Sequence, residues 1–236
     1  MDWKPIGTYT AAYTGTFNGN GYTISGLKIS TAYNQGLFGY TVNAVLANVT
    51  IKNPVISVTS SSSSNTGTLV GFANTNTTIT RCAVEGGKVT GSGRVGGLVG
   101  TANGTHIAGC YTAGTQVTGY SAVGGLVGYT NGGTIAACYA TATVTANFAD
   151  GGLVGSNTGS TTIAFCYTTE DKLVGDDSGT TVSCYDGSAT PNLTTLQGYA
   201  TEVPVDIWTA STGKKQIPLT GTIWKTLTTF NLEQLK

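Results

Sequence analysis

Two acidic residues, Asp150 and Glu170, have the residue type and the spacing that acid–base chemistry requires. Each lies three residues before a leucine, Leu153 or Leu173, that occupies the same place in two consecutive repeats of the chain. If the repeats stack one strand apart, the two carboxylates lie about 5 Å from each other, with Asp171 beside them. That separation suits the carboxylate pair of a retaining glycosidase or a calcium site.

The residues around this pair favour a simpler interpretation. The preceding repeats carry Val95 and Val123 at the position of Asp150. Lys172 follows the acidic residues and can neutralise them. A solvated loop explains these residues without a ligand, so we expect no catalytic residue, no metal site and no cofactor. The alternative is a polysaccharide-acting β-helix enzyme, a glycoside hydrolase or lyase, that uses Asp150 and Glu170.

Five cysteines recur at one position of the repeat and offer a second kind of chemistry. A zinc site needs closely spaced cysteine pairs together with histidines, whereas His106 is the single histidine of the chain and is best explained as a turn or surface residue. The odd number of thiols and their parallel directions argue against disulfides. We therefore expect free, inward-facing thiols that pack as small apolar groups. The cysteines are Cys82, Cys110, Cys138, Cys166 and Cys184.

A tyrosine follows four of these cysteines. Because side chains alternate along a strand, an inward cysteine directs the next residue outward, and the tyrosines form one surface column. Rings one strand apart can stack and stabilise the fold by about 0.5 to 1.5 kcal/mol per pair. The alternative is that the column is a ligand-binding strip for a host glycan or a partner protein. Its members are Tyr111, Tyr139, Tyr167 and Tyr185.

An internal repeat of about 28 residues positions all of these side chains. The sequence Val-Gly-Gly-Leu-Val-Gly at 95–100 returns at 123–128, and as Asp-Gly-Gly-Leu-Val-Gly at 150–155. A unit this short cannot bury its own apolar side and must stack on copies of itself. Since a β-propeller blade needs about 40 residues or more, the period predicts an all-β solenoid, a single-stranded parallel β-helix of about six to seven coils.

Spacings within one repeat predict where each coil bends. Ile107 and Cys110 are both apolar but three residues apart, which in one flat strand would place them on opposite faces, so a corner lies between them. The seven-residue step from Cys110 to Val117 places a second corner near Gly114 and gives three strands per coil. The side chains that we expect to face inward are Leu98, Leu126, Leu153, Ile107, Ile135, Val89 and Val117.

The repeats divide the chain into three parts. Residues 1–35 contain Asn-Gly turns and short strands that read as an atypical first coil, because a terminal repeat lacks one neighbour. Residues 36–185 form the repeat region. Residues 186–236, with three prolines and two tryptophans, are predicted to cap the C-terminal edge, which would otherwise be open to pairing with another chain.

Composition excludes several functions. The chain has eleven basic and eleven acidic residues, so it lacks the excess of positive charge that binds nucleic acid or an anionic membrane. No apolar run approaches the roughly 18 residues that span a bilayer, and the N-terminus has no signal-peptide pattern. We expect a monomer without nucleic-acid partners.

The repeats resemble those of the GLUG-motif proteins, bacterial surface proteins named for a Gly-Leu-(Val)-Gly core. The matching pattern is I-x-x-C-Y, then G-x-V-x-G, then V-G-G-L-V-G, over residues 36–185, and the opening of the chain is similar to such regions in gut Bacteroidetes proteins. The resemblance implies export, a right-handed β-helix and an adhesin-like role. It brings no catalytic residues, because the motif is structural. Only Asn48 keeps the asparagine that precedes the cysteine position, so the turn there departs from the family pattern.

These observations together predict a non-enzymatic, exported protein, extracellular or at the cell surface, that is an adhesin-like binding module or a stalk. Its expected partner is a host glycan or a surface protein. Some exported proteases carry such repeats beside a separate catalytic domain, but this chain contains no His-Glu-x-x-His motif.

Overall fold

The structure is a computed structural model that describes most of the repeat region. The described residues are 2–30, 33–58, 64–182 and 184–187, with the backbone of 209–210 and 213–214. The chain divides into two compact units, Met1–Ser188 and Ala189–Lys236. In the second unit only an antiparallel pair is described, β25 (Thr209–Ala210) and β26 (Gly213–Lys214), so the predicted cap at 186–236 lies almost wholly outside the described residues.

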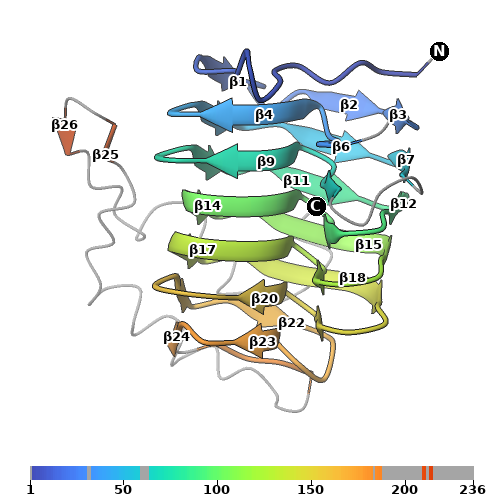
Figure 1. Cartoon of the computed structure of the whole chain (residues 1–236), viewed down its shortest axis with the longest axis vertical. Helices are drawn as coiled ribbons and strands as arrows, with labels where there is room; N and C mark the ends of the chain where they lie inside the picture. The colour runs from blue at the N-terminus through green and yellow to red at the C-terminus, as the bar shows by residue number, and fades with distance from the viewer. Residues whose placement is uncertain are drawn as a thin grey trace. The chain divides into compact units, whose positions relative to one another are not determined.

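The first unit is a parallel β-solenoid, as the repeat predicts: successive turns of strands stack on one another (Figure 1). Each turn passes through three sheets in the same order. On the first sheet one ladder joins β4 (Phe38–Val42), β9 (Val70–Asn74), β14 (Val99–Ala108), β17 (Val127–Ala136), β20 (Val154–Asn157) and β23 (Val174–Asp177). A second ladder of that sheet joins β1 (Thr16–Asn18), β5 (Val45–Ala47), β10 (Thr78–Thr80), the same β14 and β17, β21 (Thr162–Ala164) and β24 (Thr180–Val182).

The other two sheets complete each turn. The second sheet stacks β2 (Thr23–Ser25), β6 (Thr50–Lys52), β11 (Ala83–Glu85), β15 (Tyr111–Thr118), β18 (Tyr139–Thr145) and β22 (Tyr167–Thr168), and it also holds β3 (Lys28–Ile29), β7 (Val55–Ser57) and β12 (Lys88–Thr90). The third sheet stacks β8 (Asn65–Thr66), β13 (Arg94–Gly96), β16 (Val123–Gly124) and β19 (Asp150–Gly151). Gln35 forms a parallel bridge with Thr66 of β8 and so extends the third sheet by one turn. About five turns therefore reach all three sheets, and partial turns extend the other two.

The core is a set of apolar columns that run through the turns. All seven side chains predicted to face inward are at most 1% exposed, which confirms the proposed register. The column of Ile79, Ile107, Ile135 and Ile163 is in register across β10, β14, β17 and β21. Stacking like residues in this way buries a continuous apolar interior from short strands that could not form a core alone.

The two predicted corners are present. Residues at the first corner adopt positive φ in every described repeat, whether or not they are glycine: Asn48 (56°), Arg81 (49°), Gly109 (60°), Ala137 (53°) and Phe165 (54°). Each backbone N–H at this corner donates to a carbonyl of the next turn, which fixes the bend. The second corner contains Gly114 (φ 61°), and β18 is one residue shorter there, so its register with β15 shifts between Ala113 and Gln116.

The Gly-Gly pair of the repeated motif is required by close approach of the turns. A Cβ on Gly125 would lie 2.0 Å from the carbonyl oxygen of Gly152 in the next turn. A Cβ on Gly124 would lie 2.0 Å from the carbonyl oxygen of Val127 in its own turn and 2.6 Å from the backbone nitrogen of Gly155 in the next turn. No side chain fits at such distances, so the most recognisable motif of the sequence serves the backbone and carries no chemistry.

Candidate functional site

The tyrosine column exists as predicted, with its members in register on the second sheet. Tyr111 pairs with Tyr139 and Tyr139 with Tyr167, and a bridge joins Tyr167 to Tyr185. The rings of Tyr111 and Tyr139 are stacked, with centroids 4.8 Å apart and planes inclined by 4°. One face of each ring is therefore covered by the other ring.

Burial and an acidic neighbour hold this column in place. The Tyr111 hydroxyl donates to Oε1 of Glu85 (2.7 Å), whose Oε2 lies 3.0 Å from Nζ of Lys52. Burial, the hydrogen bond and the charge of Glu85 raise the pKa of Tyr111 well above its ordinary value. Burial also raises the pKa of Tyr139, which is only 9% exposed. The Tyr111 hydroxyl is thus engaged by Glu85.

The cysteines form one column of free thiols, as predicted. Cys82, Cys110, Cys138 and Cys166 are buried, and Cys184 is partly exposed. Each sulfur donates to the carbonyl oxygen two residues earlier, at 3.2 Å for Cys138 and 3.4 Å for Cys110. Burial raises the pKa of the Cys110 thiol, which disfavours the reactive thiolate. The four buried thiols pack as small apolar groups with weak hydrogen bonds. At the partly exposed end of the column, hydrogen bonding with Cys166 lowers the pKa of the Cys184 thiol.

His106 lies on β14 and faces the neighbouring strand. Its Nδ1 is 2.9 Å from the Thr134 hydroxyl, and burial lowers its pKa, so it is neutral near pH 7. The structure therefore places it on a strand, half-buried, where the sequence suggested a turn or surface residue. Within the part of the chain that the structure describes, no three His, Cys, Asp or Glu side chains gather into a metal-binding group.

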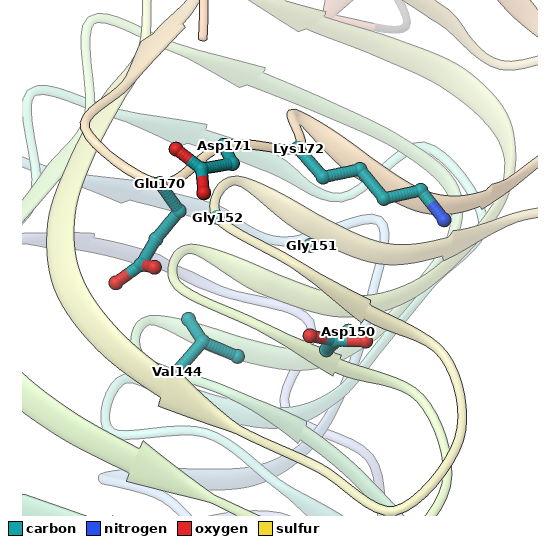
Figure 2. Close-up of a pocket in the computed structure, with 7 residues that line it drawn as sticks. All are labelled: Val144, Asp150, Gly151, Gly152, Glu170, Asp171 and Lys172. Carbon is teal, nitrogen blue, oxygen red and sulfur yellow. The ribbon is translucent and has the colours of Figure 1, made fainter. Parts of the chain in front are cut away.

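The acidic residues line one small cavity of about 150 Å³ (Figure 2). Asp150, Glu170, Asp171 and Lys172 surround it together with Val144, Gly151 and Gly152. In Figure 2 the side chains of Glu170 and Asp150 lie on opposite sides of the cavity, and Lys172 extends away from Glu170. The sequence spacing thus correctly brings Asp150 and Glu170 to one place.

The two carboxylates lie on different kinds of element and do not form the regular ladder that the repeat spacing predicts. Asp150 begins β19, the last strand of the third sheet, whereas Glu170 lies in the loop after β22. The Lys172 ammonium donates to the carbonyl oxygen of Gly175. A strand thus carries Asp150, whereas a loop carries Glu170.

Sequence reasoning missed an aromatic pair at the corner between the second and third sheets. Tyr120 and Phe148 are 53% and 65% exposed, and their rings meet edge to face with centroids 5.1 Å apart. The available signal was one aromatic residue in the same short loop of two consecutive repeats. It was hidden because the two residues are offset by one position in the repeat and match no column.

The described residues include no helix that combines the length and apolarity needed to cross a membrane.

Comparison with known proteins identifies the repeat. Residues 119–145 match the family model of the GLUG motif. Over 105 residues, or 42% of its length, the chain is 39% identical to halomucin from Haloquadratum walsbyi, and the match spans 1% of halomucin. The motif predicted from the repeat pattern is thus present in the chain.

A solved structure shares the fold. It is described as a candidate immunoglobulin A1 protease from Bacteroides ovatus, and it matches with a TM-score of 0.64 and 23% identity over 79% of this chain and 64% of its own. At this identity the likeness establishes the solenoid fold alone. The chain spans only part of both proteins, so their activities and partners are not assigned to this chain.

Proposed function

We propose that this chain, which carries the GLUG motif, is a non-catalytic scaffold segment of an exported surface protein, a rigid solenoid that spaces or presents other parts of that protein. The observation that carries the proposal is the tyrosine column. The rings of Tyr111 and Tyr139 stack on each other and the Tyr111 hydroxyl donates to Glu85, which supports a packing role for the column. The buried isoleucine and leucine columns support the same role for the other repeated positions.

Export and a surface location are supported by a known protein that contains a similar segment. Halomucin, whose name likens it to mucins, contains a segment 39% identical to part of this chain. The match covers 1% of that protein, so a segment of this kind is a small part of a very large molecule. A solenoid with zero net charge, few charged residues and an apolar core suits a segment with a structural role.

Two other functions remain as alternatives. An adhesin would use the tyrosine column to contact a host glycan or a surface protein. A polysaccharide-acting enzyme would use Asp150 and Glu170, and the separated, differently supported carboxylates speak against it.

The double substitution Tyr139→Ser with Tyr167→Ser tests the scaffold role of the column. We expect a lower melting temperature, because stacked rings are lost, with unchanged retention on a mucin and glycan array. Tyr22→Ser is the matched control, since Tyr22 is a 74% exposed tyrosine outside the column, and it should change neither property. A double variant that stays folded but loses retention shown by the wild type would refute the scaffold role and favour the adhesin.

A further inference from the structure

Two aromatic side chains form an exposed apolar patch on adjacent turns of the solenoid. Single exposed aromatic residues are common on protein surfaces and need no explanation. Tyr120 and Phe148 differ because their rings are in contact, 5.1 Å between centroids at 73°, while more than half of each residue remains exposed. The pair therefore offers a preassembled apolar platform whose outer ring surfaces face solvent.

Phe148 lies close in the chain to residues that line the acidic cavity. Phe148 belongs to the loop of residues 146–149, between the end of β18 at Thr145 and the start of β19 at Asp150. Asp150 lines the cavity, and two residues of chain limit its Cα to about 7 Å from that of Phe148. Val144, just before the loop, lines the cavity as well. One short loop thus connects Phe148 to Val144 and Asp150, which line the cavity.

The size and charge of the cavity restrict what can enter it. Its volume of about 150 Å³ is below the roughly 300 Å³ of sites that enclose a whole small molecule, so it accepts one functional group. Three acidic residues, Asp150, Glu170 and Asp171, line it with one basic residue, Lys172, whose ammonium donates to a backbone carbonyl. The local excess of negative charge favours a cationic group, and aromatic rings nearby add cation–π attraction.

We propose that Tyr120, Phe148 and this cavity bind an amino sugar. The protonated amine enters among the carboxylates, and the apolar face of the sugar ring packs on the aromatic pair. The surface is small, two rings and one loop, whereas a stable protein partner needs about 800 Å² on each side. A short oligosaccharide fits that footprint better than a folded protein. This inference is independent of the scaffold role, because a scaffold can carry such a site.

Binding of a glucosamine hexamer to the whole chain tests the proposal, at a mildly acidic pH where the amines are protonated and the carboxylates ionised. The N-acetylglucosamine hexamer is the matched ligand without charge and should bind about tenfold more weakly. Phe148→Ser and Asp150→Asn should each weaken glucosamine binding about fivefold to tenfold, and added salt should weaken it further. Tyr22→Ser, an equally exposed change elsewhere, should leave the affinity unchanged.

Several results would overturn the proposal. They are no binding of the glucosamine hexamer, equal binding of the two hexamers, or wild-type affinity in folded Phe148→Ser. Tighter binding of a lysine tetrapeptide than of the hexamer would assign the site to a cationic peptide segment and reject the amino sugar. Thermal unfolding of each variant accompanies the titration. If Phe148→Ser does not fold, the nearly isosteric Asp150→Asn still decides the question.

Discussion

Replacing Leu126 by aspartate places a carboxylate in the middle of the apolar core. Leu126 is fully buried, its carbonyl accepts a hydrogen bond from Leu98 N–H (2.9 Å), and its own N–H donates to Leu153 (2.9 Å). Loss of the leucine packing costs about 2 to 5 kcal/mol. A fully buried carboxyl has its pKa raised by up to about 3 to 5 units. The resulting penalty grows by about 1.4 kcal/mol for each pH unit above the unfolded pKa of about 4, so at pH 7 it adds about 4 kcal/mol. The sum equals much of the roughly 5 to 15 kcal/mol stability of an ordinary domain.

The pH dependence separates the two contributions. The folded state holds the raised pKa and so binds the proton more tightly than the unfolded state. The charge penalty is therefore absent below the unfolded pKa of about 4 and grows as pH rises towards the folded pKa. Leu126→Ala is the matched control, because it leaves a cavity without a titrating group and its loss of stability should not vary with pH in this window.

Chemical unfolding monitored by circular dichroism, at several pH values, measures both variants. We expect the aspartate variant to be largely unfolded at pH 7 and to regain stability on acidification relative to Leu126→Ala. An aspartate variant with wild-type stability at pH 7 would mean that Leu126 does not face the core, and the register described here would be wrong.

Three further predictions follow from the same structure. Ala137→Gly should raise the free energy of unfolding by up to about 1 kcal/mol, because Ala137 has a φ of 53° that costs a residue with a Cβ about 1 to 2 kcal/mol; a lower melting temperature would contradict this. Cys110, 1% exposed, should not react with a thiol reagent until denaturant is added, and rapid labelling of the native protein would contradict its inward placement. A screen of plant, mucin and bacterial polysaccharides should show no turnover, whereas turnover that Asp150→Asn abolishes would establish an enzyme.

The sequence was sufficient for the fold because each repeat constrains the others. An inward residue at Leu98 requires inward residues one period later. The parity argument predicted a corner between Ile107 and Cys110, and the structure has it at Gly109. The missing asparagine did not alter that corner. Ala137 and Phe165 take the same left-handed conformation, because hydrogen bonds to the next turn fix the backbone there.

The candidate sites were less predictable, since they depend on places where the repeat fails. The last turn is shortened, so Glu170 lies in a loop where the spacing indicated a ladder partner for Asp150. The burial of Tyr139 depends on how its neighbours pack, which alternation alone does not give. The pairing of Tyr120 with Phe148 needs two loop residues in non-equivalent positions to meet, and no periodic pattern reports that.

Exposure of the chain on intact cells of its source is the most direct test of a surface scaffold. An antibody raised against the folded solenoid should stain unpermeabilised cells, and mild protease treatment of those cells should remove the signal while a cytoplasmic marker stays intact. Staining that requires permeabilisation would place the chain inside the cell and contradict the account.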